Sequence, residues 1–489
     1  MEEPTPRRGS SIGRIVIAAV VVAALVVGGL VVLQVGDGAT PGPPSPSEAP
    51  PNIVLILTDD QRWDSLWAMP NVRHLLGDHG VTFTNGFVSN PLCCPSRASI
   101  LTGQYSHGTG VYTNFPPLGG FAGFDPTTTI ATVLQQKGYE TALVGKYFNG
   151  YLGTEVPPGW SRWMAFNGPN GGVWYYDYTM SIDGVERHYG SSPSDYSTSV
   201  ATQHAVSFIQ KTHRPFFLYF APSAPHLPAV PGPGHEDAFP SLAPFRGRSF
   251  NEADTSDKPP WLRRVPRFDP DHIARADRLR AAQLRSLPPV DDAVGEIVDA
   301  LESTGVLDRT LILFMSDNGF MHGEHRLSDK QSPYEEAIRV PMILRYDPLT
   351  AGGVRDPRIV ANIDVAPTFA DAAGTDMPGA EGTSLLNLVR RPTAEGMRWL
   401  LLEHVGAPRD PDYGSRPDRY VIPTYCGIRG RRWKYIDYAD GSQELYDLTR
   451  DPFEERNMID DPAGRGAMRE LKRELRRLCD PPPPGFPPP

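Results

Sequence analysis

The sequence predicts an α/β fold with a large sheet that helices cover on both faces. Four short runs are apolar throughout and do not alternate with polar residues, which is typical of strands buried on both faces. These runs are Asn52 to Thr58, Thr141 to Val144, Pro215 to Phe220 and Thr310 to Met315. Helical patterns lie between them, such as Thr128 to Lys137 and Pro289 to Ser303, and Gly305 stands just past the end of the second.

After about Gly374 the pattern changes, and we expect a smaller C-terminal α+β subdomain. The segment from Arg431 to Asp447 resembles a hairpin with a turn at Asp440-Gly441. A basic amphipathic helix follows, roughly from Ala463 to Leu478. The predicted boundaries are 52–375 for the large domain and 376–480 for the subdomain. Residues 481–489 are almost all proline, which predicts a disordered tail.

The N-terminal segment predicts export from the cytoplasm. Arg7, Arg8 and Arg14 precede an uncharged apolar run, Ile15 to Leu33, that is long enough to span a bilayer. Positive charges on this side would keep residues 1–14 in the cytoplasm. Residues 15–35 are therefore predicted to be a transmembrane anchor or a signal segment, followed by a Pro/Gly/Ser-rich linker over 36–51. The lack of a convincing cleavage site favours the anchor over a cleaved signal peptide, so the remainder is extracytoplasmic, either membrane-anchored or secreted.

Composition limits the class of partner. The chain has 489 residues, enough for one large and one smaller domain, and a formal net charge of −10 that argues against nucleic acid. An anionic substrate stays compatible with this charge, because a site can be locally positive. Four cysteines are too few for a disulfide scaffold, and Cys426 and Cys479 are as compatible with a disulfide as with two free thiols.

Polar side chains follow each of the four apolar runs: Asp59, Asp60, Lys146, His226, Asp317 and Asn318. Ligands bind at the carboxyl ends of the strands in open α/β sheets, so we expect these side chains to meet at one edge. Clustered carboxylates repel one another and favour a hard divalent cation, either calcium or magnesium. Each acidic pair could instead cap a turn or helix, but two pairs at matching strand ends favour the metal.

A second cluster of reactive residues surrounds Cys93. Pro95 suits the first turn of a helix, which places Cys93 just before the helix N-terminus. Backbone N–H groups and the helix dipole favour an anion there, and Arg97 adds a planar, permanently charged fork for sulfate or phosphate oxygens. The residues therefore indicate a nucleophile beside an oxyanion site, although a buried structural cysteine is the other interpretation.

The segment Cys93-x-Pro95-Ser96-Arg97-x-x-x-x-Thr102-Gly103 resembles the signature of the sulfatase family, in which the first cysteine is oxidised to formylglycine. The similarity extends over roughly Asn52 to Asn457. Further motifs that resemble family motifs are Thr58 to Gln61, Gly145 to Tyr147, Ala224 to Pro228, Ser316 to Gly319, Lys330 with Tyr334 to Pro341, Ile363 to Thr368 and Glu444 to Leu448.

The resemblance implies an alkaline-phosphatase-like fold with a large mixed sheet, and makes 52–375 the sulfatase catalytic domain. It implies a bound Ca²⁺, with Mg²⁺ as the alternative, and maturation by a formylglycine-generating enzyme. The implied metal ligands are Asp59, Asp60, Cys93, Asp317 and Asn318. The implied catalytic residues are Cys93, Arg97, Lys146, His226, Asp317 and Lys330.

The mechanism that the resemblance implies uses the hydrated aldehyde of residue 93. One hydroxyl of this gem-diol, assisted by Asp317 as base, attacks sulfur, and the other then expels sulfate. Arg97, Lys146 and Lys330 would neutralise the sulfate oxygens, and His226 would bind sulfate or protonate the departing alcohol.

Within sulfatases the chain is most similar to the N-acetylglucosamine-6-sulfatase and heparan endosulfatase branch, through Leu92 to Arg97, Gly145 to Asn149 and Ser194 to Thr198. This implies a sulfated carbohydrate substrate of the glucosamine 6-O-sulfate type. One departure is Phe148, where many sulfatases have a histidine, and Asn149 is the candidate to replace part of its hydrogen bonding. The aromatic segment from Gly150 to Tyr178 is expected to form either the pocket rim or core, and 228–267 the other wall.

Two other functions are also compatible with the sequence. Relatives of the same fold use the same motif to hydrolyse phosphonate monoesters or phosphodiesters, whose shape is close to that of sulfate esters. A non-catalytic glycan-binding protein is the third hypothesis and requires Cys93 to stay a thiol. His107 and His322 are interpreted as structural, whereas His325, close to Lys330, is a candidate for the pocket.

Overall fold

The computed structural model describes residue 1 and residues 50–487, except for positions 170, 173, 351 and 407–419. Beyond residue 1, the predicted segments 1–14 and 15–35 lie outside the described residues, as does the predicted linker up to residue 49. Within the described ranges, no helix has both the length and the apolar character needed to cross a membrane.

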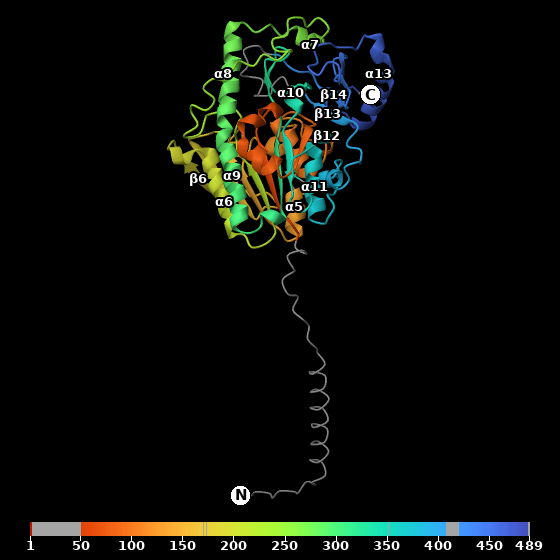
Figure 1. Ribbon diagram of the computed structural model, residues 1–489. Coiled ribbons are helices and arrows are strands. Elements are labelled where there is room, and N and C mark those ends of the chain that lie inside the picture. The colour runs from red at the N-terminus through yellow and green to blue at the C-terminus, as the bar shows by residue number, and fades with distance from the viewer. Residues whose placement is uncertain (2–49, 170, 173, 351, 407–419, 488–489) are drawn as a thin grey trace. The chain divides into compact units, whose positions relative to one another are not determined.

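A ten-stranded mixed sheet forms the centre of residues 50–489, in the order β12-β2-β11-β8-β1-β7-β3-β4-β5-β6 (Figure 1). Its central strands β8, β1, β7 and β3 are the four apolar runs of the sequence, and they pair in parallel. The bounds are β1 Asn52–Thr58, β2 Val81–Phe87, β3 Glu140–Gly145, β4 Arg162–Asn167, β5 Tyr178–Ile182, β6 Val185–Tyr189, β7 Phe216–Ala221, β8 Thr310–Ser316, β11 Met342–Arg345 and β12 Val354–Ala361. The predicted large mixed sheet is confirmed.

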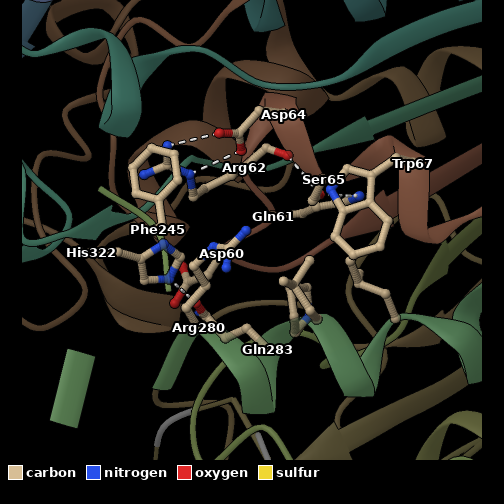
Figure 2. Close-up of a pocket in the computed structure, with 13 residues that line it drawn as sticks. Asp60, Gln61, Arg62, Asp64, Ser65, Trp67, Phe245, Arg280, Gln283 and His322 are labelled. Atoms are coloured by element: carbon tan, nitrogen blue, oxygen red, sulfur yellow. Dashed lines mark hydrogen bonds and ion pairs between the residues drawn. The ribbon is translucent and has the colours of Figure 1, made fainter. Parts of the chain in front are cut away.

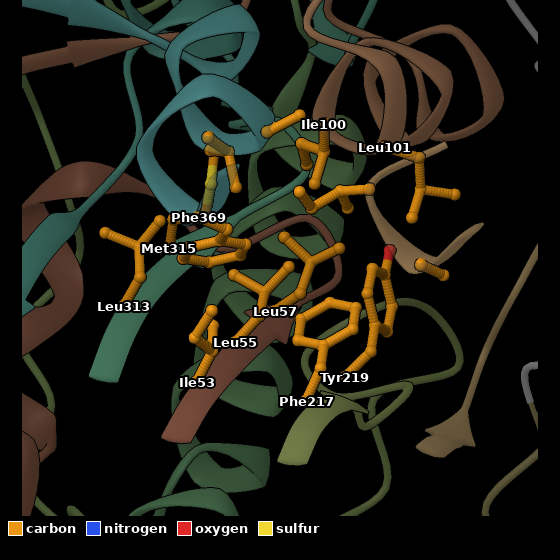
Figure 3. Close-up of a cluster of buried hydrophobic side chains, with 14 of the residues drawn as sticks. Ile53, Leu55, Leu57, Ile100, Leu101, Phe217, Tyr219, Leu313, Met315 and Phe369 are labelled. Atoms are coloured by element: carbon orange, nitrogen blue, oxygen red, sulfur yellow. The ribbon is translucent and has the colours of Figure 1, made fainter. Parts of the chain in front are cut away.

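Helices cover both faces of this sheet, which explains why its central strands are apolar throughout. Ile53, Leu55 and Leu57 of β1 pack toward α2 (Cys93–Thr102), α5 (Ile130–Gln136) and α11 (Val365–Ala372) (Figure 3). Val54 and Ile56 point the other way, toward α6 (Ser197–Lys211) and α9 (Pro288–Ser303). Each such side chain contributes roughly 1.5–3 kcal/mol when fully buried, so the sheet edge that carries polar residues rests on a rigid core.

Shorter elements connect these layers. A two-stranded ribbon, β9 with β10, follows the end of β8 and leads to the loop that carries Lys330. The bounds are α3 Ser106–Thr109, α4 Gly120–Gly123, α7 Pro260–Arg263, α8 Pro270–Ser286, α10 Glu335–Ile338, α12 Leu385–Arg390, β9 Met321–His322 and β10 Ser328–Asp329.

The C-terminal part forms its own antiparallel sheet, in the order β13-β14-β15-β16, with α13 (Arg465–Leu478) packed on it. The bounds are β13 Leu400–His404, β14 Tyr425–Arg429, β15 Trp433–Tyr438 and β16 Gln443–Asp447. The predicted hairpin is β15 with β16, and Gly441 takes the left-handed conformation at its turn (φ 84°). The predicted basic helix is α13.

The structure shows two features of the C-terminal part that the sequence did not predict. Cys426 and Cys479 form a disulfide between β14 and the residue after α13, which resolves the alternative that the sequence left open. Residues 481–489 were predicted to be a disordered tail, yet the structure describes them as far as 487. Pro483 is buried there, and Phe486 packs against the C-terminal core.

His107 of α3 links the large domain to β13. Its Nδ1 lies 3.0 Å from Oε1 of Glu403, and its Nε2 lies 3.2 Å from Oε1 of Glu381. Burial alone would lower the pKa of His107, but the hydrogen bonds to these two carboxylates outweigh that effect and raise its pKa to about 10. The imidazolium is therefore part of the contact between the two parts of the chain, in agreement with the structural role expected from the sequence.

Replacing His107 with Gln is expected to lower the free energy of unfolding by about 2 kcal/mol at neutral pH, the scale of hydrogen bonds to charged groups. The folded-state pKa lies above the ordinary value of 6.5. The contribution is therefore complete below about pH 6.5 and is lost as the pH rises through about 10. Chemical denaturation of both proteins between pH 6 and pH 10 should show a difference that shrinks with rising pH, and a difference that grows would contradict this assignment.

Candidate active site

The carboxyl ends of the central parallel strands bring the polar residues together. Asp59 and Asp60 follow β1, and Asp317 and Asn318 follow β8 directly beside it. The amide of Asp60 donates to Oδ1 of Asp317 (3.2 Å), so the two strand ends are joined at this point. These four side chains are almost fully buried, although all are polar. A buried polar cluster needs partners, and its surroundings supply them.

Lys146 follows β3, and a glycine before it sets its position. Gly145 has a φ of 113°, and a Cβ added there would lie 2.0 Å from the carbonyl oxygen of Ala221 in β7. Only glycine therefore allows β3 and β7 to approach this closely at the edge. The ammonium of Lys146 reaches Oδ2 of Asp59 at 2.5 Å.

Cys93 is the first residue of α2, one position further into the helix than the sequence predicted. Its Sγ lies 3.5 Å from Oδ1 of Asp59 and 2.9 Å from Nζ of Lys330. Burial raises the pKa of the Cys93 thiol well above its usual range, and the nearby charge of Asp59 adds to this. An unmodified thiol here is consequently a poor nucleophile, because the thiolate is the reactive form.

Three cations surround the acidic cluster. Nε of Arg97 donates to Oδ2 of Asp317 (2.9 Å), and Nη1 of Arg97 donates to the carbonyl of Lys146 (2.8 Å). Lys330 lies 2.6 Å from Oδ1 of Asp60. Burial alone would raise the pKa of Asp59, but the neighbouring cations, Lys146 foremost, hold it well below its usual range. The cluster thus keeps ionised carboxylates and cations in one buried space.

His226 lies at the same edge, beyond the end of β7. Its Nε2 is 3.7 Å from Oδ2 of Asp60, and the side chain is 20% exposed. Its Nδ1 lies 2.7 Å from the carbonyl oxygen of Leu227, which can only accept, so Nδ1 is the donor. This hydrogen bond directs Nε2 toward the cluster. All six predicted catalytic residues and all five predicted metal ligands therefore gather at one place.

The cluster has the donor atoms that a divalent cation requires. Ligand atoms of Asp59, Asp60, Cys93 and His226 all lie within 4.8 Å of one another. Oδ1 of Asn318 is buried and, among the residues that the structure describes, meets no hydrogen-bond partner, which is the state expected of an oxygen that a cation would coordinate. A set rich in carboxylate and amide oxygens suits calcium or magnesium. The residues therefore fit a bound divalent cation.

A cavity of about 250 Å³ opens beside Asp60 (Figure 2). Its lining combines aromatic, cationic and acidic side chains: Asp60, Gln61, Arg62, Asp64, Ser65, Trp67, Pro225, Phe245, Arg280, Gln283, Leu284, Leu287 and His322. Arg62 forms paired hydrogen bonds of 3.0 and 2.9 Å to the carboxylate of Asp64. The guanidinium carbons of Arg62 and Arg280 lie 5.1 and 5.3 Å from the centre of the Phe245 ring. Such a lining suits a polar ligand with a flat apolar face.

Several pocket residues were not identified from the sequence. His322 was interpreted as structural, yet it lines the cavity, with Nε2 2.5 Å from Oε1 of Gln283. Its position four residues after Asn318 was the one signal available. His325, the favoured histidine, is instead buried away from the cavity, where it stacks on Tyr334 and contacts Glu252 (2.8 Å).

The two segments that were expected to form the walls of the pocket have different positions in the structure. Phe245, from the segment 228–267, lines the cavity. In the aromatic segment, Trp160, Trp163 and Tyr175 are buried in the core, and Trp174 is exposed. The departure at Phe148 is also explained by packing, since that ring stacks on Phe124 with centroids 4.5 Å apart. The backbone N–H of Asn149 donates to Sγ of Cys94 (3.3 Å).

Comparison with known proteins agrees with this site. Residues 51–375 match the family model described as Sulfatase, and residues 323–480 match N-sulphoglucosamine sulphohydrolase, C-terminal. N-acetylglucosamine-6-sulfatase of Homo sapiens is 34% identical over 449 residues, which cover 82% of this chain and 80% of that protein. The putative extracellular sulfatase Sulf-1 homolog of Caenorhabditis elegans is 36% identical over 69% of this chain, and the aligned part spans about half (49%) of that relative.

Solved structures share the fold. A protein in complex with its substrate D-glucosamine-2-N,6-O-disulfate superposes with a TM-score of 0.74 at 25% identity, covering 89% of this chain and 99% of that one. The phosphonate monoester hydrolase of Agrobacterium radiobacter gives a TM-score of 0.69 at 21% identity, covering 88% and 95% of the two chains. The fold is that of the alkaline-phosphatase-like class, with the polar site at its strand ends. Since the family model covers residues 51–375, the chain belongs to the sulfatase family of sulfuric ester hydrolases.

Proposed function

We propose that the protein removes the 6-O-sulfate from glucosamine units of a sulfated carbohydrate. The observation that carries this proposal is the contact of Cys93 with Lys330 (2.9 Å) and Asp59 (3.5 Å), next to a cavity that begins at Asp60. Supporting it, relatives named N-acetylglucosamine-6-sulfatase cover most of the chain, and a similar solved structure holds a 6-O-sulfated glucosamine.

The nucleophile is proposed to be residue 93 after oxidation of its thiol to formylglycine. The hydrated aldehyde would supply the attacking hydroxyl, and a bound Ca²⁺ would supply charge neutralisation in the acidic cluster. Asp59, Asp60, Asp317, Asn318 and residue 93 are the proposed ligands of this ion. Mg²⁺ is the alternative, but a site with this many oxygen donors favours calcium.

The chain's own residues position the ester. Arg97, Lys146 and Lys330 form a buried cationic group whose N–H donors are directed at the acidic cluster, and they would transfer part of this bonding to sulfate oxygens. Asp317 is the proposed base, because its charge acts on residue 93 within the same buried cluster and Arg97 fixes its carboxylate. His226 can donate from Nε2, when protonated, to the departing alcohol.

The pocket beside Asp60 is proposed to hold the sugar. The flat face of Phe245 offers a surface for a pyranose ring, and the carboxylate of Asp64 and the guanidinium of Arg280 offer hydrogen bonds to its hydroxyl groups. The metal and the basic group around residue 93 would bind the sulfate itself. Recognition of the sugar therefore depends on residues that come mainly from outside the central strand ends.

Maturation and location follow from the same proposal. Conversion of Cys93 needs a formylglycine-generating enzyme as a transient partner. We place the catalytic domain outside the cytoplasm, as relatives named extracellular sulfatase support, with residues 15–35 as an anchor or signal segment and 36–51 as a linker. The domain boundaries 52–375 and 376–480 are part of this proposal.

Three substrates distinguish the candidate activities: glucosamine 6-sulfate, an aryl sulfate and an aryl phosphonate monoester. We expect kcat/KM to be highest for glucosamine 6-sulfate, because only this substrate fills the pocket beside Asp60. A preference for the phosphonate would promote the phosphonate monoester hydrolase, whose fold this chain shares. Activity on the aryl sulfate alone would keep the sulfatase and discard the amino sugar. Binding of glycans without any turnover, with Cys93 still a thiol, would indicate a glycan-binding protein.

A further inference from the structure

Helix α13 carries a row of basic side chains along one flank, beside the apolar residues that pack on the C-terminal sheet. The spacing of these residues places them along one stripe of the helix: Arg465, Arg469, Lys472, Arg473 and Arg476. The four arginines are exposed and Lys472 is half-buried, whereas Leu471 and Leu475 are buried against the sheet. In a chain with a net charge of −10, this row is a local concentration of positive charge.

Within the described residues, much of this charge has no acidic partner. Glu470 pairs with Arg398, and Glu474 pairs with Arg473 and Arg477. Within the described part of the chain, Arg465, Arg469 and Arg476 have neither an ion pair nor a side-chain hydrogen bond. Their guanidinium groups are therefore available to an external anion.

The helix is held firmly in place. Leu471 and Leu475 pack into the C-terminal core, and the disulfide of Cys479 with Cys426 ties the end of the helix to β14. A partner that binds the basic row therefore meets a preformed surface, and little backbone ordering opposes binding.

A hollow of about 280 Å³ continues from the row at the end of α13. Its lining includes Lys472 and Arg476 of the row, together with Tyr435, Asp437, Gln443 and Phe486. Nζ of Lys472 lies 6.0 Å from the centre of the Tyr435 ring. An aromatic ring beside cations and polar groups suits a sugar that carries an anionic substituent.

This surface lies on the other face of the C-terminal sheet from the active site. On β15, Nζ of Lys434 donates to the carbonyl of Pro333, in the loop that follows Lys330 (2.9 Å). The next residue, Tyr435, lines the hollow beneath α13. Because successive side chains of a strand point to opposite faces, the sheet separates the hollow from the active site.

We propose that the basic row and its hollow bind a sulfated polysaccharide chain at a second site, separate from the active site. The inference that the partner is a polysaccharide rests on the proposed function. The inference that the partner is anionic follows from the positive charge of α13. A membrane surface fits less well, because membrane-binding helices expose apolar side chains, and those of α13 are buried or half-buried against the C-terminal core. Such a site would retain a long substrate while its sulfated units are processed.

The test is a double charge reversal, R469E with R476E, in the full-length matured protein. The matched control is K211E with R214E, which makes the same charge change at exposed residues near the end of α6. Binding to a heparin chain, measured by calorimetry at low salt, should weaken at least about tenfold in the first variant and stay within about twofold in the control. Replacement of the same two arginines with lysine should retain most of the binding.

Activity assays separate this site from the active site. Both double variants should hydrolyse an aryl sulfate like the wild type, whereas only R469E with R476E should lose activity on long sulfated chains below saturation. Unchanged heparin binding in that variant, or an equal loss in the control, would overturn the proposal. So would selective loss of binding to phosphatidylserine vesicles, which would assign the row to a membrane. Failure of the wild type to hydrolyse glucosamine 6-sulfate would refute the proposed function and leave the binding result intact.

Discussion

Cys93→Ala should abolish sulfate ester hydrolysis, with a loss of at least about a thousandfold in kcat, because the proposed nucleophile is removed. The fold should survive. The side chain is small, and alanine, which keeps the β-carbon and favours helix, leaves the first turn of α2 in place. The expected loss of stability is about 1–2 kcal/mol. Steady-state kinetics with an aryl sulfate, together with a thermal unfolding curve, measures both effects.

Cys94→Ala is the matched control, since Cys94 is the adjacent buried cysteine of the same helix. Its sulfur lies 3.3 Å from the backbone nitrogen of Asn149, whereas the sulfur of Cys93 contacts Asp59 and Lys330. This variant should therefore keep most of its activity. Mass spectrometry of the peptide that spans both cysteines should find the aldehyde at position 93 in it, and no aldehyde in Cys93→Ala. An aldehyde at position 94 would refute the assignment of the nucleophile.

The central strands could be predicted because burial on both faces leaves a strong mark in the sequence. Asn52–Thr58 and Thr310–Ser316 are apolar between their first and last residues, and an acidic residue follows each strand. Parallel pairing then brings Asp59 and Asp317 to one edge without any further information. The same rule placed Lys146 and His226, so the core of the candidate site followed from local patterns.

The pocket could not be predicted in this way, because its residues come from distant segments. Arg62, Phe245 and His322 meet only after the chain has folded. The sequence indicated the segment of Phe245 as a wall, but it did not identify Arg62 or His322 as pocket residues. The aromatic segment from Gly150 to Tyr178 shows that composition alone does not distinguish a ligand site from a core. The rings of Trp160 and Trp163 suit contact with a sugar as well as burial in a core. In the structure, Trp160 packs against Phe217 and Trp163 packs against Tyr147, so both belong to the core.

The sequence also did not decide whether Cys426 and Cys479 form a disulfide. The two residues are 53 positions apart, and their proximity depends on α13 folding back onto β14, which leaves their Cα atoms 6.4 Å apart. The hairpin and the basic helix were each predicted from local signals, but how they pack was not. The second binding surface proposed above depends on that packing, because the hollow lies between these elements.

Replacing Asp317 should remove the metal and the activity together. Asp317→Ala deletes a proposed ligand and leaves Nε of Arg97 without its buried partner at 2.9 Å. Breaking such a buried pair costs about 3 kcal/mol or more, so this variant should also be less stable. Asp317→Asn keeps the shape and one acceptor oxygen for Arg97. It should therefore unfold near the wild-type temperature, yet lose most of its metal and at least about a hundredfold in kcat.

Metal content and metal replacement complete this experiment. Elemental analysis of the purified wild type should find one divalent ion per chain, and a chelator should remove activity that calcium restores better than magnesium, since several flexible oxygen ligands suit the larger ion. The two Asp317 variants should bind less than one ion and respond weakly to added calcium. An Asp317→Asn protein with full metal content and wild-type turnover would remove Asp317 both from the ligand set and from the role of base.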